Sequence, residues 1–159
     1  MSGMTHAEWI ELRNAKMLDW MAGNREAVDC VHTITEICDV WDDLVDLDKH
    51  VSEEAINGAF VKAFIALAGN SFYKRHEAQF FAILATGINA WLDANELQKA
   101  KTEKERMLAF YIRTFGFEIV HLAAMLAGGW DHLRRVSLEM RMFFESETYA
   151  EWEHRHGME

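Results

Sequence analysis

Proline is absent from this chain of 159 residues, and cysteine occurs only twice. Proline is the residue that most strongly interrupts helices, whereas the abundant Leu, Ala, Glu, Met and Phe favour them. Cys30 and Cys38 would lie ~12 Å apart on one continuous helix, which is too far for a disulfide. The sequence therefore predicts an all-α protein with two reduced thiols, as is usual in a cytoplasm.

Long apolar runs and basic residues are also scarce. No unbroken apolar run is long enough to span a membrane, and the first residues lack the basic and apolar regions of a secretory signal. Sixteen Lys and Arg stand against 26 Asp and Glu, so the formal net charge is −10. Such a charge disfavours general binding to nucleic acid or to an anionic membrane, and it favours metal cations and basic proteins as partners.

Half of the residues are apolar and 26% are charged, which is typical of one folded domain. Apolar residues recur every three and four residues, and Thr5 with Glu8 and Thr102 with Glu105 have the spacing of capping boxes. Ser52 is expected to cap a further helix. We predict a single domain over 1–159, a compact bundle of about six helices, at 5–21, 26–48, 52–69, 74–98, 102–128 and from 130 onward, with an acidic tail that frays from about 145.

The predicted helix 26–48 is the most informative segment. One half of its helical wheel is apolar, and the other half carries an acidic face without any Lys or Arg. Neighbouring acids three or four residues apart repel each other by ~0.2–0.5 kcal/mol per pair. Either the face is simply solvated, or it is neutralised by cations from other helices, or it binds Mg²⁺ or Mn²⁺, which prefer clustered carboxylates. The candidate metal ligands are Glu36, Asp39, Asp42, Asp43 and Asp46.

The segment from Val40 to Asp46, followed by Asp48-Lys49 and Val51-Ser52, resembles a group of small helical proteins carried by tailed phages and prophages. The resemblance is sharp only around this segment. It implies a viral origin, and hence a location in the host cytoplasm, without implying an activity.

Parts of the same pattern are similar to two enzyme families. Asp42-Asp43-Leu44-Val45-Asp46 resembles the DDxxD motif of class I isoprenoid synthases, which holds Mg²⁺ against a diphosphate. These enzymes also have a second metal motif. Asp131 and Glu139 fit its two ends here, but Arg135 occupies its middle position. Glu8-Trp9-Ile10-Glu11 and Glu36-Ile37-Cys38-Asp39 resemble the ExxE and ExxD motifs of all-α nucleotide pyrophosphohydrolases of the MazG and dimeric dUTPase types. Both resemblances imply a metal-dependent reaction on a diphosphate.

The predicted helix 102–128 contains a second pair of candidates. Between Phe115 and Ala127 only Glu118 and His121 are neither apolar nor glycine, and they share one helix face. They form either a metal-binding or catalytic pair or a structural pair inside the core. In the helix before it, Thr86, Asn89 and Asp93 could form a polar line facing helix 26–48 or helix 102–128.

Two function hypotheses follow. The first is Mg²⁺-dependent hydrolysis of a nucleotide or other diphosphate, with Glu36, Asp43 and Glu118 as catalytic residues. The second is a non-enzymatic acidic protein that binds a host or virion protein, with homodimerisation left open. The cations expected to neutralise the acidic face are Arg134, Arg135 and Arg141, with Lys74 and Arg75 as alternatives. The remaining candidate polar residues are His32, Asn89, Asp93, His121, Arg134 and Arg135.

Overall fold

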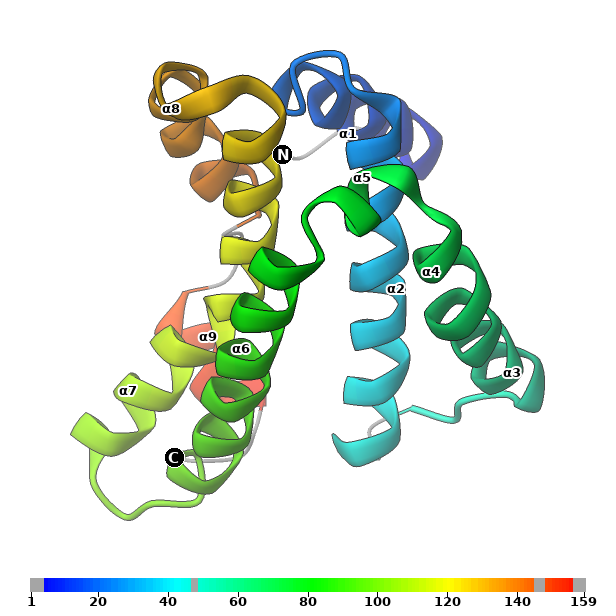
Figure 1. Ribbon diagram of the computed structural model, residues 1–159. Helices are drawn as coiled ribbons and strands as arrows, with labels where there is room; N and C mark the ends of the chain where they lie inside the picture. Colours follow the sequence, from blue (N-terminus) through cyan, green and yellow to red (C-terminus); the bar gives the residue numbers. More distant parts are fainter. Residues whose placement is uncertain (1–4, 47–48, 145–147, 156–159) are drawn as a thin grey trace.

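The computed structural model describes residues 5–46, 49–144 and 148–155, and within these ranges it contains helices and no strand (Figure 1). The all-α prediction is confirmed. The helices are α1 (His6–Trp20), α2 (Arg25–Asp46), α3 (Glu53–Val61), the π-helix η1 (Lys62–Ala66), α4 (Leu67–Gly69), α5 (Ser71–Arg75), α6 (Glu77–Leu97), α7 (Glu103–Arg113), the 3₁₀ turn η2 (Thr114–Gly116), α8 (Phe117–Phe144) and α9 (Tyr149–Arg155).

Most helix boundaries follow local signals in the sequence. Ser52 accepts a hydrogen bond from the Ala55 amide at the start of α3, and Thr102 accepts one from the Glu105 amide at the start of α7, as predicted. Helix α1 begins directly after Thr5, whereas the side chain of Glu8 lies outside the described residues. Gly23 has a φ of 78° in the turn between α1 and α2, where a side chain would be strained.

Two breaks shape the second half of the chain. The predicted helix 102–128 is interrupted at η2, so α7 and α8 are separate helices. The predicted break at Gly128-Gly129 is a kink inside α8, where Gly129 has a φ of 81° and a ψ of 179°. Hence one apolar pattern in the sequence corresponds to two helices that pack on different neighbours.

The buried side chains form two clusters. The larger joins α1, the first half of α2, α5, the start of α6 and α8, and its largest members are Trp20, Met21, Phe72, Phe80 and Met140. The smaller joins α6, α7 and α9 through Ala94, Ala109, Phe110 and Trp152. The second half of α2 lies beyond the larger cluster, with α3 and η1 on one side and α6 on the other (Figure 1).

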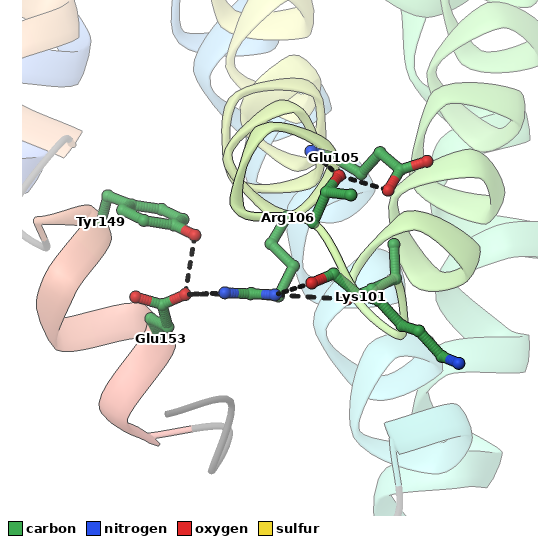
Figure 2. Close-up of polar contacts among 7 residues, drawn as sticks. Lys101, Glu105, Arg106, Tyr149 and Glu153 are labelled. Carbon is green, nitrogen blue, oxygen red and sulfur yellow. Dashed lines mark hydrogen bonds and ion pairs between the residues drawn. The ribbon is translucent and has the colours of Figure 1, made fainter.

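The prediction of a frayed tail from about 145 is wrong for the part that the structure describes. Helix α9 packs on α7, and the Trp152 side chain is only 1% exposed. Figure 2 shows Arg106 of α7 donating to the Glu153 carboxylate at 3.0 Å and to the Lys101 carbonyl at 3.1 Å. Residues 145–147 and 156–159 lie outside the described residues.

The start of α9 carries a capping box that the sequence interpretation missed. The Thr148 hydroxyl accepts from the Glu151 amide, and the Glu151 carboxylate accepts from the Thr148 amide. The spacing Thr-x-x-Glu was the signal available in the sequence. It was overlooked because the surrounding glutamates suggested a solvated tail.

The stretch Glu103–Phe143 is long and apolar enough to cross a membrane by length and composition alone, although charged residues interrupt it. The core helices of soluble proteins pass the same test, and α8 buries Ile119, Val120, Ala123 and Ala124 within the larger cluster.

Candidate functional site

The acidic face of α2 (Glu36, Asp39, Asp42, Asp43 and Asp46) lies at the centre of the candidate site. At 100° per residue, Glu36 and Asp43 fall on one side of this face, Asp42 and Asp46 fall on the other, and Asp39 lies between them. Because α2 lies between α3–η1 and α6, the two sides of its acidic face contact different helices.

On the side of α3 and η1, two carboxylates bind lysines. The Lys62 ammonium of η1 lies 2.9 Å from the Glu36 carboxylate, and Lys49 lies 2.7 Å from that of Asp43. The side chains in both pairs are partly exposed, so each pair contributes at most ~1 kcal/mol. Their main effect is to offset the like-charge repulsion along α2.

On the side of α6 and α7, the acids meet an indole and a guanidinium. The Trp91 Nε1–H donates to the Asp42 carboxylate at 2.7 Å, and the Trp91 ring lies 4.3 Å from that of Trp41 between centroids. The Arg113 guanidinium lies 3.7 Å from the Asp46 carboxylate and 3.9 Å from that of Asp42. It also donates to the Gln98 amide oxygen at 3.2 Å.

Cations from neighbouring segments therefore neutralise most of the acidic face. This neutralisation was one of the alternatives left open by the sequence. The cations differ from the expected ones, because Lys49, Lys62 and Arg113 occupy these positions. Arg141 instead binds Glu118 at 2.7 Å, and Arg135 lies 2.8 Å from the His132 ring. Lys49 lies six residues after Asp43, so this pair is local in the chain, whereas the pairs of Lys62 and Arg113 depend on how η1 and α7 lie against α2.

Asp39 is the carboxylate that faces two cavities of about 340 Å³ each. Burial raises the pKa of Asp39 above its usual range, and the neighbouring charges of Asp42 and Asp43 raise it further. Both cavities also share Cys38, Arg113 and Phe117 as lining residues. The first cavity adds Arg13, His32 and Glu36 to an apolar wall, and burial lowers the pKa of His32.

The predicted catalytic residues are not brought together as a set. Glu36, Asp43 and Glu118 each bind a different cation, respectively Lys62, Lys49 and Arg141. Across the ranges described, no three His, Cys, Asp or Glu side chains converge in a group that could hold a metal ion. Of the predicted ligands, Glu36 and Asp39 line the first cavity, and Asp39 and Asp42 line the second.

Glu118 and His121 do not bond to each other as a pair. Glu118 binds Arg141 near the surface, whereas His121 is buried in α8. The His121 Nδ1 lies 2.8 Å from the Phe117 carbonyl, and its Nε2 lies 3.3 Å from the Ser137 carbonyl across the Gly129 kink. A neutral imidazole carries one N–H, so His121 donates to one of these two carbonyls, and its ring packs between the two halves of α8.

The remaining candidates lie in separate places. Asn89 donates to Asp93 at 2.9 Å on an exposed part of α6, so the polar line of Thr86, Asn89 and Asp93 faces away from α2 and α8. Arg134 donates to the Ser137 hydroxyl at 3.4 Å. The predicted polar cluster is thus divided between a cavity wall, the outside of α6 and the second half of α8.

The two thiols are unsuited to nucleophilic chemistry. Both cysteines are free, as expected from their spacing. Burial raises the pKa of Cys30 to about 12, and burial together with Asp39 and Asp42 raises that of Cys38 to about 11. A cysteine nucleophile needs the thiolate form near neutral pH, which both environments disfavour.

Large apolar side chains gather on outward faces that the sequence interpretation had assigned to the core. On α6, Phe81, Ile88 and Leu92 are exposed at 71%, 43% and 50%. On α3 and η1, Phe60, Val61, Phe64 and Ile65 are also exposed. Periodicity could reveal that these helices are apolar, but it could not reveal which apolar side lacks a neighbour.

Compared with protein-family models, with curated proteins and with solved structures, the chain gave no match.

Proposed function

We propose that this protein is a non-enzymatic interaction protein whose α6 helix binds an amphipathic, basic segment of another protein. The observation that carries the proposal is the α6 outer stripe, defined as Phe81, Ile88 and Leu92. These residues recur at i, i+7 and i+11 and therefore share one side of the helix. Single exposed apolar residues are common, whereas an aligned exposed stripe indicates a binding surface.

The opposite side of α6 is already occupied. Phe80 and Ala94 are fully buried, and Trp91 contacts α2 through Trp41 and Asp42. The outer stripe therefore cannot be the side that holds α6 to its own molecule. Exposed apolar stripes of this kind bind the apolar face of a partner helix, with anchor residues at helical spacing.

Charges around the stripe indicate the chemistry of the partner. Helix α6 contains Glu77, Asp93 and Glu96 and no Lys or Arg. A complementary segment would present apolar residues flanked by Lys or Arg, and the net charge of −10 would speed its approach. If the chain is phage-encoded, as the resemblance of its Val40–Asp46 segment implies, a host or virion protein in the host cytoplasm is the expected partner.

Affinity capture from the cell that produces the protein tests this proposal. The wild-type chain, Phe81→Glu and Leu138→Glu are used as baits, because Phe81 and Leu138 are equally exposed at 71% but lie on different helices. We expect a partner retained by the wild type and Leu138→Glu and lost with Phe81→Glu. A synthetic peptide from that partner should then bind α6 by chemical-shift mapping. Equal retention by all three baits would contradict the proposal.

We also propose, as a second candidate, divalent-metal binding with a nucleotide or other diphosphate ligand beside Asp39. It is supported by the first cavity, whose wall combines Glu36 and Asp39 with Arg13, His32 and Arg113. Carboxylates suit Mg²⁺ or Mn²⁺, and guanidinium groups suit phosphate oxygens. The ion pairs of Glu36, Asp43 and Glu118 with other residues make this candidate secondary.

A further inference from the structure

The outward face of α3 and η1 has a size pattern opposite to that of a helix packed on its own core. The partly buried apolar side chains of this segment are mostly small, namely Ala55, Ala59 and Ala63, together with Ile56. The large ones point outward: Phe60 is 58% exposed and Phe64 is 72% exposed, and their rings stack with centroids 5.9 Å apart. We call the outward set Phe60, Val61, Phe64 and Ile65 the α3 outer face.

The π-helix η1 separates the outward phenylalanines from the core. A π turn adds one residue to a helical turn, so it shifts the following side chains around the helix axis. In the structure Leu67, which follows η1, reaches the core, whereas Phe64 within η1 is exposed. Phe60 lies before η1, in α3, and is exposed independently of this shift.

The area of this face is more than half of what each partner buries in a standard dimer interface. Four large apolar side chains at these exposures present ~500 Å² of apolar surface, comparable to the largest patch on a typical monomer. A standard protein interface buries about 800 Å² on each partner. The α3 outer face would therefore supply more than half of one side of such an interface.

The charges on this segment favour a second copy as the partner. Residues 53–75 include two glutamates and three basic residues, so the formal charge of this segment is +1. The whole chain has a formal charge of −10. The negative charges that would make two copies repel each other therefore lie mostly outside this segment. The acids Glu53 and Glu54 lie at the start of α3, and Lys74 and Arg75 lie about one helix length later in α5; all four are exposed. A two-fold axis perpendicular to the α3–η1 helices would make the two copies antiparallel and bring each acidic start near a basic end.

We propose that two copies of this chain associate through the α3 outer face, with their α3–η1 helices antiparallel. This inference is independent of the α6 outer stripe, because the two surfaces lie on opposite sides of α2 (Figure 1). Phe64 at the centre of each copy would pack against Phe60 or Val61 of the other. The stacked phenylalanines would then occupy an apolar interface in place of water.

Sedimentation equilibrium from ~1 to ~100 μM tests the proposal. The wild-type chain is expected to reach twice its mass of 18.4 kDa. Phe64→Glu should shift the dissociation constant upward by at least a hundredfold, whereas Phe81→Glu is the matched control, with 71% exposure against 72%. Phe60→Ala with Phe64→Ala gives a second test without an added charge, and circular dichroism verifies that each variant is folded.

Three results would overturn the proposal: a wild-type monomer at the highest concentration, a dimer unaffected by Phe64→Glu, or equal dissociation by Phe81→Glu. Because Phe81→Glu is also the variant that should lose the α6 partner, failure of one surface is distinguishable from failure of the other.

Charge reversal tests the antiparallel arrangement. Glu54→Lys and Lys74→Glu should each weaken the dimer about threefold to tenfold, and the double variant should recover most of the wild-type affinity. Additive weakening in the double variant would rule out the antiparallel pairing. Lys104→Glu, on an exposed turn of α7, serves as the control for net charge.

Discussion

His121 shows how a residue with catalytic potential is used for structure. Its ring lies between two backbone carbonyls on either side of the Gly129 kink, so its removal leaves a cavity and takes away the N–H that a neutral imidazole donates to one of these carbonyls. We expect His121→Ala to lower the free energy of unfolding by about 2–4 kcal/mol. Glu118→Gln should cost less than ~1 kcal/mol, because the Glu118–Arg141 pair is partly exposed.

Urea denaturation of these two variants measures the difference. If Glu118→Gln proved as destabilising as His121→Ala, the two residues would form a unit that the observed contacts do not show.

The cysteines lead to a second prediction for single residues. A pKa of about 11 for Cys38 leaves roughly a hundredfold less thiolate at pH 8 than an ordinary cysteine would have, and Cys30, with a pKa of about 12, should react more slowly still. Alkylation by iodoacetamide followed by mass spectrometry should therefore modify both thiols only after unfolding in urea. Rapid modification of Cys38 in the folded protein would mean that its environment opens frequently.

At the scale of the helices, Gly129 determines how α8 turns. Its φ of 81° with a ψ of 179° is a conformation that residues with a side chain avoid, so Gly129→Ala is expected to cost about 1–3 kcal/mol. Gly58, within α3, is a suitable control, because an added Cβ there meets no atom within 4 Å. Gly58→Ala should stabilise the protein by about 0.5–1 kcal/mol through lower chain entropy. Thermal unfolding of both variants tests the contrast.

Helix α9 depends on one buried side chain and one ionic cluster. Trp152→Ala should cost about 3–5 kcal/mol of packing, which is enough to release α9 from α7. Hydrogen exchange in 149–155 should then become fast, while exchange in the first half of α8 stays slow. Trp130→Ala, at a residue 64% exposed, should leave both regions unchanged.

The pH dependence of α9 follows from Glu153. Hydrogen bonds from Tyr149 and then Arg106 hold the pKa of the Glu153 carboxyl below its usual value of 4.5. A lowered pKa in the folded state means that this contribution is fully present above the unfolded value and is lost as the pH falls through the lowered one. The indole NMR signal of Trp152 should therefore stay constant from pH 7 to 5 and shift in stronger acid. Glu153→Gln should remove this acid-dependent step.

For the molecule as a whole, the predicted metal site is tested by calorimetric titration with Mg²⁺ and Mn²⁺, with and without nucleoside triphosphates and prenyl diphosphates. If the second candidate function holds, millimolar metal should release heat, and Asp39→Asn should weaken binding at least tenfold through the loss of a ligand and its charge. Asp93→Asn, on the outside of α6, should have no effect. Absence of heat and of a thermal shift would leave protein binding as the better account of the acidic surface.

The sequence by itself determined the features that depend on neighbours along the chain. The absence of proline, the capping residues Ser52 and Thr102 and the glycine pair at 128–129 act within a few residues, so they predicted an all-α chain and most of its breaks. The Thr148–Glu151 box belongs to the same class, because its signal was also local. The acidic face of α2 could likewise be placed correctly from the helical period alone.

Only the tertiary structure decided which groups of the chain contact each face of a helix. Lys62 and Arg113 reach the acidic face through the positions of η1 and α7 beside α2, whereas Lys49 is close to Asp43 along the chain. Periodicity identifies an apolar side of a helix, but burial depends on whether another element covers it. The phenylalanines at 60, 64 and 81 remain exposed because no other described element of this chain covers them, and that fact directs attention to its partners.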